Sequence, residues 1–347
     1  MSSPVLSPPP RPIVLLGALA SVGALLFLLS ETVAPVYPEV HEREAMRQAQ
    51  ADTIGFVTLG HSHNRAVLFD SLKPDGSSLA GFHLWRSSRD PFETRWAFEQ
   101  ERPKLPRLRA VFVAVAPYAW DNTQIAASAR DRRRELYALH TSAGRWHQDI
   151  GLRVHARLAP LMRGDHWKGV VYGIAGRPLD FQVEPNGWID DRPRDTVRDA
   201  ATLDSIAVLT VEAHVDVDAR AQAADPALCE RAAAALAAIP DIAGAPVRVV
   251  FYTPPYWPAY GTGLPAASTC DLRGPVRTLA DAQDHVVYFD DSQHADFVED
   301  AGLFLDADHL NGFGAAQYSA LLRDRLAADP LVRDSLHGDL SAPLGDR

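Results

Sequence analysis

The sequence predicts an α/β fold in which helices cover both faces of a central parallel sheet. Short apolar runs such as Ala110–Ala116 and Val247–Thr253 are typical of strands that are buried on both faces. Longer segments with helical character separate these runs, and strands that alternate with helices indicate a parallel sheet. The chain of 347 residues is long enough for one large domain or two small ones.

The first strand is expected at Thr53–Leu59, because this run is rich in β-forming residues and ends at Gly60, a turn signal. Pro91 suits the first position of a helix that runs to Glu101. The other expected strands are Leu79–Leu84, Ala110–Ala116, Asp204–Val211, Val247–Thr253 and Val286–Phe289. The other expected helices are His41–Gln50, His63–Leu72, residues 124–163, Pro226–Ile239 and Gly314–Ala327.

An uncharged apolar run of 17 residues, Ile13–Leu29, marks the N-terminal region and reaches the short end of what crosses a bilayer. Arg11 precedes the run and acidic residues follow it, so the positive-inside rule places the N-terminus in the cytoplasm and the rest outside. We favour an uncleaved transmembrane anchor. A cleaved signal peptide is the alternative, although no small-x-small cleavage site is evident after the run, and a buried core helix is the third.

These patterns divide the chain into five parts. They are a cytoplasmic N-terminus (1–12), a transmembrane anchor (13–30), a stalk (31–50), an α/β domain (51–330) and a C-terminal tail (331–347). Within the domain, the segment at about 124–203 is long for a single crossover, and we expect it to be a helical elaboration that shapes the substrate site.

The bulk composition excludes some classes of protein. The net charge of -10 argues against a nucleic-acid partner, since proteins that bind nucleic acid are usually basic. The two cysteines, Cys229 and Cys270, either pair in an oxidising compartment or stay as two buried thiols, and the sequence leaves both open. Because there is no CxxC pair, a structural zinc site is not expected, and we expect neither a metal nor a cofactor.

Ser62 follows the first expected strand in Gly60-His61-Ser62-His63. Ligands of open parallel sheets bind beyond the carboxyl ends of the strands, and N–H groups of a helix that starts there can hold an oxyanion. Ser62 is therefore a candidate nucleophile. Serine is also a common helix N-cap at such turns. A third interpretation makes His61 and His63 metal ligands, as in calcineurin-like phosphoesterases, but the other metal-binding segments of that family do not precede this turn.

Asp306 and His309 stand three residues apart, just before the last expected helix. This spacing allows the carboxylate to hold the imidazole Nδ1–H, so that the other ring nitrogen can take a proton from Ser62. A nearby carboxylate also raises the pKa of the histidine. Asp308 is expected to point elsewhere, as a cap or into solvent. The alternative for the whole segment is a polar loop with an N-cap aspartate.

The two segments together resemble the SGNH (GDSL-like) hydrolase superfamily, whose first block ends in Gly-x-Ser and whose last block is Asp-x-x-His. The longer segment Phe304–Asn311, followed by Gly314-Ala315, looks like a branch of membrane-anchored proteins that modify cell-envelope polymers, such as the lipoteichoic-acid D-alanylation and alginate O-acetylation proteins. The strand that ends in Thr253-Pro254-Pro255 also looks like the penultimate strand of that branch. The resemblance covers about residues 50–328 and implies a flavodoxin-like three-layer sandwich.

The chain departs from this family at three positions. His61 stands where the family usually has Asp or Ser, Ser88 is the best match to the second-block glycine, and Asn122 is a weak match to the third-block asparagine. The resemblance implies that Ser62, Ser88 and Asn122 supply the oxyanion hole.

The resemblance implies an extracytoplasmic serine esterase or O-acyltransferase, in which Ser62 is the nucleophile, His309 the general base and then acid, and Asp306 the residue that orients His309. The implied partners are an acylated polysaccharide or envelope polymer, a membrane-bound acyltransferase and the membrane itself. Four aromatic residues can stack on sugar rings, although core packing is their commoner fate: Trp85, Trp188, Tyr256 and Trp257. A catalytically inactive binding or scaffold protein is the alternative function, and a metallophosphoesterase is the third.

Overall fold

The computed structural model describes Ser21, residues 38–72, 80–85 and 89–120, Asn186, and residues 196–268 and 270–328. These residues form an α/β fold around one sheet of five strands, in which every pairing is parallel. The strands are β1 (Ile54–Leu59), β2 (Ala80–His83), β3 (Ala110–Ala114), β4 (Arg248–Thr253) and β5 (Val286–Asp290).

The order of the strands across the sheet is β2-β1-β3-β4-β5. This is one of the two common orders of doubly wound sheets, and in both of them ligands bind where the winding reverses. Here the reversal falls at β1, because β2 lies on one side of it and β3 on the other. The carboxyl end of β1, where Ser62 follows, is therefore the topologically favoured place for a site.

Alternate residues of the central strands fill two separate hydrophobic clusters, one on each face of the sheet. In β3, Val111 and Val113 belong to one cluster, while Ala110 and Phe112 belong to the other. Each buried valine or phenylalanine side chain stabilises the fold by about 1.5–3 kcal/mol. A strand buried on both faces needs apolar residues at every position, which explains the continuous run in the sequence.

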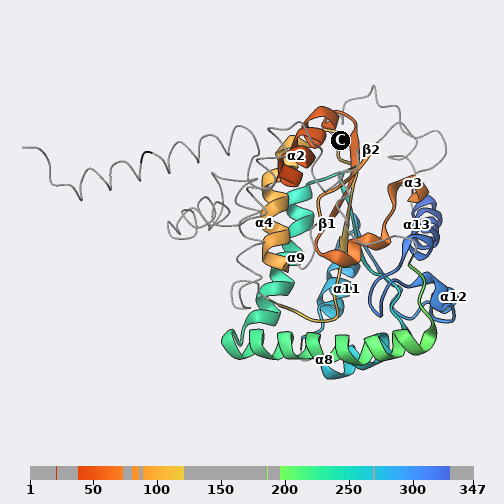
Figure 1. The fold of residues 1–347 in the computed structure, drawn as a ribbon. Coiled ribbons are helices and arrows are strands. Elements are labelled where there is room, and N and C mark those ends of the chain that lie inside the picture. Colours follow the sequence, from red (N-terminus) through yellow and green to blue (C-terminus); the bar gives the residue numbers. More distant parts are fainter. Residues whose placement is uncertain are drawn as a thin grey trace, which may run out of the picture.

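Helices cover both faces of the sheet, and Figure 1 views the sheet nearly along its edge. One face is covered by α2 (Pro38–Gln50), α4 (Pro91–Glu101), α9 (Leu228–Ala243) and α11 (Arg273–Ala282). The other face is covered by α3 (Phe69–Leu72), α10 (Pro258–Ala267), α12 (Ala295–Val298) and α13 (Gly312–Ala327). The long helix α8 (Ala200–Ala224) runs across the end of the sheet, from the side of α9 to the side of α12 and α13 (Figure 1).

Three short 3-10 helices complete the described elements: η1 (Ser62–Ala66), η2 (Arg102–Lys104) and η5 (Ala301–Leu303). The sequence predicts one helix over His63–Leu72, but the structure divides this segment into η1 and α3. The division falls at Val67, which is fully buried and has an extended backbone, so the chain straightens where it enters the core.

One predicted strand is wrong. Asp204–Val211 lies inside α8, which begins after its N-cap Asp199, whose carboxylate accepts a hydrogen bond from Thr202 N–H at 2.7 Å. The β-branched and apolar residues of this segment favour a strand when taken alone. In the folded chain, Leu203 and Ala207 are buried one helical turn apart, while Val208 and Leu209 are exposed.

Helix α2 packs against the domain instead of standing apart from it. The Arg43 Nη1 donates to the Trp85 carbonyl at 3.2 Å, and the Arg47 Nε lies 3.0 Å from a carboxylate oxygen of Glu101. The packed part of the domain therefore extends into the segment that the sequence assigns to the stalk. The expected anchor, apart from Ser21, lies outside the described residues, and none of the helices in the described part of the chain is both long and apolar enough to cross a membrane.

Cys229 and Cys270 form a disulfide that closes a loop of 41 residues, with their Cα atoms 5.5 Å apart. The bond ties α9 to the segment that leads into α11, on the face of the sheet that carries α4. Of the two alternatives that the sequence leaves open, the structure therefore has the paired form.

Candidate active site

The turn after β1 is built around Gly60 and Asn64. Gly60 has a φ of +108°, a conformation that glycine adopts without strain, and a Cβ placed there would lie 3.1 Å from the Asn64 amide nitrogen. That amide donates to the carbonyls of Leu59 at 2.6 Å and His61 at 3.0 Å, while its oxygen accepts a hydrogen bond from the Tyr252 hydroxyl at 2.9 Å. One buried side chain thus fixes the path of the chain between β1 and η1.

Ser62 is the first residue of η1 and is partly exposed. Its Oγ lies 2.7 Å from Nε2 of His309. The two residues are 247 positions apart in sequence, and the fold brings them together at the carboxyl edge of the sheet. A serine used only as an N-cap would turn its hydroxyl back to a nearby backbone N–H, whereas this hydroxyl faces an imidazole.

The loop that carries His309 is held by the backbone. Phe304 and Leu310 form an antiparallel bridge, and the Leu305 N–H donates to the His309 carbonyl at 2.9 Å. Asn311 then caps α13, since its side chain accepts the Gly314 N–H at 3.0 Å and donates to the Gly302 carbonyl at 2.6 Å. The loop is therefore a tight turn that ends at a capped helix.

Asp306 lies on the opposite side of the imidazole from Ser62. The His309 Nδ1–H donates to Asp306 Oδ1 at 2.8 Å. The structure therefore brings together the three residues that the sequence selects, in the order carboxylate, imidazole and hydroxyl, with hydrogen-bond distances at both contacts. In this arrangement a serine can act as a nucleophile with the imidazole as its base.

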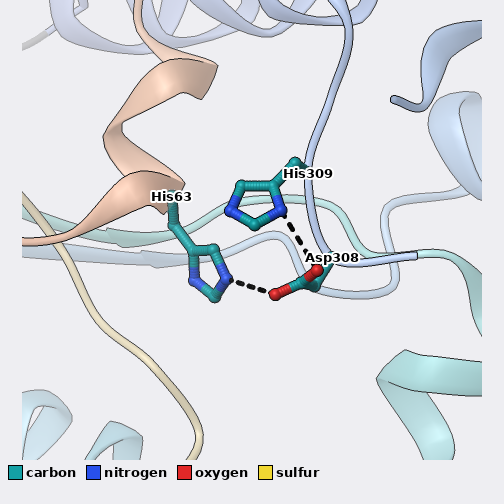
Figure 2. Close-up of side chains that lie close together, drawn as sticks. All are labelled: His63, Asp308 and His309. Atoms are coloured by element: carbon teal, nitrogen blue, oxygen red, sulfur yellow. Dashed lines mark hydrogen bonds and ion pairs between the residues drawn. The ribbon is translucent and has the colours of Figure 1, made fainter. Parts of the chain in front are cut away.

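Asp308 corrects one sequence expectation, because it is buried and turned into the site rather than into solvent. Its Oδ1 lies 3.1 Å from His309 Nδ1, and its Oδ2 lies 3.1 Å from His63 Nε2. Figure 2 shows this carboxylate between the two imidazoles. On the far side of His63, Nδ1 lies 3.1 Å from the Tyr256 hydroxyl. A chain of four side chains therefore leads from Tyr256 to His309.

The charges of these groups are strongly coupled. Burial alone would lower the pKa of His309, but the charges of Asp306 and Asp308 and their hydrogen bonds raise it to about 10. Burial alone would raise the pKa of Asp308, but the charge of His309 and the hydrogen bonds from His309 and His63 hold it well below its usual value. Burial lowers the pKa of His63, in spite of its bond to Asp308. His63 is therefore neutral where His309 is charged.

The donor atoms of His63, Asp308 and His309 lie within 4.8 Å of one another, close enough for a metal ion to gather them. Each of these atoms already faces a hydrogen-bond partner: His63 Nε2 and His309 Nδ1 both point at the carboxylate. Neutral His63 donates its Nε2–H, and His309 donates its Nδ1–H. In the structure the three residues form a hydrogen-bonded network.

The oxyanion hole is described only in part. Ser62 opens η1, so its backbone N–H has no partner within that helix and can donate to a ligand. Ser88 and Asn122, the two other predicted donors, lie outside the described residues, as do Trp188 and most of the expected elaboration at 124–203.

The expected sugar-stacking aromatics are core residues where the structure describes them. Trp85, Tyr256 and Trp257 are all buried, and the indole N–H of Trp257 donates to Asp204 at 2.7 Å. Tyr256 reaches the site through His63 instead. Sequence reasoning missed the roles of Asn64, Asp308 and Tyr256 here; the one available signal was the pair of histidines that flanks Ser62.

A cavity of about 820 Å³ lies elsewhere, along β5, α11 and the segment after β5. Arg277, Tyr288 and Arg325 are among its lining residues, but Ser62, Asp306 and His309 are not. This cavity therefore does not identify the site, and the assignment depends on the chemistry of the side chains.

No protein-family model matches the chain, and a search of curated proteins finds no match either.

Proposed function

We propose that the chain is an SGNH-like, extracytoplasmic serine esterase or O-acyltransferase, with Ser62 as nucleophile, His309 as base and Asp306 as the residue that orients His309. The observation that carries the proposal is the continuous hydrogen bonding from Asp306 through His309 to Ser62, at 2.8 and 2.7 Å. The α/β fold with a five-stranded parallel sheet is compatible with such an enzyme, and Ser62 follows β1 at the edge where such sheets bind ligands.

In the first half-reaction, His309 Nε2 takes the proton of the Ser62 hydroxyl as Oγ bonds to the carbonyl carbon of an acyl ester. The carbonyl oxygen becomes an oxyanion, which the backbone N–H of Ser62 is placed to stabilise. When the tetrahedral intermediate collapses, the ester C–O bond breaks and the leaving alkoxide takes the proton from Nε2. The products are an alcohol and an acyl group on Ser62 Oγ.

The second half-reaction decides between an esterase and a transferase. A water molecule or a sugar hydroxyl gives its proton to Nε2 and attacks the acyl-enzyme, and Ser62 Oγ recovers the proton as it leaves. Asp306 stays a carboxylate throughout, because its task is to hold the Nδ1–H and to stabilise the imidazolium. No step of this cycle requires a metal or a cofactor.

We propose an O-acylated glycan or other cell-envelope polymer as substrate, by the resemblance of the two motif segments alone. An extracytoplasmic location is supported by the Cys229–Cys270 disulfide, since such bonds persist in oxidising compartments. It is also supported by the apolar run at residues 13–29, which suits an anchor.

The test is the labelling of purified full-length protein by a fluorophosphonate probe, which reacts with activated serines. We expect Ser62→Ala to abolish labelling and His309→Gln to reduce it by about a thousandfold or more, because the base is then lost. Ser292→Ala is the control, since the Ser292 hydroxyl donates to Asp290 and is not hydrogen-bonded to Ser62, Asp306 or His309. Each variant must show the wild-type far-ultraviolet spectrum and melting transition.

Labelling that survives in Ser62→Ala would remove Ser62 from the proposed role. An inactive SGNH-like binding or scaffold protein is the second candidate, favoured by the departures from the family blocks at His61, Ser88 and Asn122. A folded wild-type protein that resists the probe over the whole range from neutral to about pH 10 would favour that candidate.

A further inference from the structure

We propose that Asp308 is a positioning residue, which His63 holds in place and which, together with Asp306, orients His309 through its Nδ1–H. Asp308 thereby sets the pH range in which Ser62 is activated. The kinetic part of this proposal rests on the function proposed above. The structural part concerns His309 alone and can be tested without turnover.

Two carboxylates share one N–H group. The His309 Nδ1 atom lies 2.8 Å from Asp306 Oδ1 and 3.1 Å from Asp308 Oδ1. A Ser-His-Asp arrangement needs only one such carboxylate. The Asp308 N–H also donates to Asp306 Oδ1 at 3.3 Å, so the backbone of the loop holds the two carboxylates on the same side of the ring.

His63 leaves Asp308 little freedom to turn away. The Tyr256 hydroxyl donates to His63 Nδ1, which fixes the neutral tautomer with its proton on Nε2, and that Nε2–H donates to Asp308 Oδ2. Tyr256 stays a donor because burial raises the pKa of its hydroxyl well above the ordinary value. Both oxygens of Asp308 are therefore bonded to imidazoles, in the arrangement shown in Figure 2.

The other histidines and tyrosines that face this cluster are neutral. Burial lowers the pKa of His61 and His214, and burial raises the pKa of the tyrosines. The neutral groups are His61 before η1, Tyr118 after β3, His214 on α8, Tyr256 before α10 and Tyr260 on α10. The guanidinium of Arg198, which precedes α8, donates to the Leu305 carbonyl in the loop that carries His309, at 3.3 Å. Asp306, Asp308 and His309 are the charged side chains of the cluster that bond to one another.

This charge pattern has a direct consequence for the base. Because the two carboxylates raise the pKa of His309 to about 10, most molecules have a protonated imidazole at neutral pH. Activity should therefore rise with pH up to that value. Loss of the Asp308 charge should lower the pKa of His309, so that more molecules have a neutral imidazole at neutral pH. Each neutral imidazole should then be a weaker base and less firmly oriented.

The experiment is a pH titration of histidine Cε1 signals by NMR in the full-length protein, with the His309 signal assigned by its loss in His309→Gln. Asp308→Asn keeps the size of the side chain and removes its charge, and should lower the His309 midpoint by about one to three pH units. Asp296→Asn, which removes an exposed carboxylate on α12, is the matched control and should leave the midpoint in place.

The rate of fluorophosphonate labelling is measured over the same pH range. The rising limb should move to lower pH in Asp308→Asn and stay in place in Asp296→Asn. His63→Phe removes the donor that holds Asp308 and should slow labelling by about tenfold, whereas the amide of His63→Gln can still donate and should restore most of the rate.

An unchanged His309 midpoint in folded Asp308→Asn would overturn the proposal, even if that variant were less stable, because Asp308 would then be a structural residue only. If Asp308→Asn does not fold, the difference between His63→Phe and His63→Gln decides: equal rates overturn the proposal. A third outcome is that the His309 titration midpoint falls in Asp308→Asn while even the wild-type protein does not react with the fluorophosphonate. That outcome would support the role of Asp308 at His309 and refute the serine esterase.

Discussion

The two segments that meet at the candidate site are held in different ways. The serine turn, residues 60–66, depends on the side chain of Asn64, which is fully buried and bonded to two carbonyls and to Tyr252. The histidine loop, residues 304–311, is held by a backbone bridge and carries two carboxylates and an imidazole. The serine turn therefore depends on one neutral side chain, whereas the histidine loop has a backbone-held path and orients the His309 ring by charge.

This difference implies that the two segments respond to different disturbances. Loss of one neutral side chain should displace Ser62 at every pH, whereas loss of one charge should change the pH at which His309 works. Three measurements can separate the two cases: the free energy of unfolding, the rate of fluorophosphonate labelling, and the pH midpoint of that rate. Each variant should change a different combination of these three quantities.

Removal of the Cys229–Cys270 disulfide should have the largest effect on stability and none on the pH midpoint of labelling. A closed loop of 41 residues corresponds to about 4 kcal/mol in the chain-entropy account. The double variant Cys229→Ser/Cys270→Ser should therefore unfold at a clearly lower urea concentration, measured by circular dichroism. The bond lies on the face of the sheet that α4 and α9 cover and contacts none of the charged side chains around His309. A labelling rate whose pH midpoint shifts in this variant would therefore contradict our view that these charges alone set the midpoint.

Asn64→Ala should have the next largest effect. It leaves the buried carbonyls of Leu59 and His61 and the hydroxyl of Tyr252 without this partner, at a cost of about 3 kcal/mol. Ser62 should then be misplaced, so that fluorophosphonate labelling slows by about a hundredfold without a change in its pH midpoint.

Thr262→Ala is the matched control for Asn64→Ala, because it also removes a side-chain bond to a carbonyl, but on the exposed surface of α10. A labelling rate in Asn64→Ala that equals the rate in Thr262→Ala would show that the serine turn keeps its shape without Asn64.

Much of this molecule is predictable from sequence, because the local pattern and the fold agree. Strands β3 and β4 are buried on both faces and appear as continuous apolar runs, and α4 begins at its predicted proline. Ser62, Asp306 and His309 also meet as their motif segments suggest. The strands and the helix start follow from local residue types, whereas the meeting of Ser62 with His309 is expected only from the resemblance of their two motif segments.

Other features could not be predicted, because they depend on contacts between distant segments. Nothing near Asp308 in the sequence indicates that His63, 245 positions away, will hold it. The sequence of Asp204–Val211 predicts a strand because its apolar residues do not follow one helical face, and Val208 and Leu209 are exposed in α8. Its buried residues become recognisable only once the helix lies across the end of the sheet (Figure 1).

The pH dependence of stability gives the smallest expected effect and bears most directly on the histidine loop. The pKa of His309 is raised from 6.5 to about 10, so protonated His309 contributes stability that is complete below about pH 6.5 and is lost as the pH rises towards 10. The pKa of Asp308 is lowered from 3.8, so its contribution is complete above that value and is lost only in acid. Between pH 6.5 and 10, the free energy of unfolding should therefore decrease in both proteins. The total decrease should be about 2 kcal/mol larger in the wild type than in Asp308→Asn.

Urea unfolding of both proteins at a series of pH values measures this difference, and Asp296→Asn corrects for the other groups that titrate in the same range. Parallel curves for wild type and Asp308→Asn would mean that Asp308 does not act on the protonation of His309. The histidine loop would then be held like the serine turn, by neutral contacts, and the contrast between the two segments would disappear. Diverging curves, together with a normal slope in Asn64→Ala, would establish that charge stabilises one segment and hydrogen bonding the other.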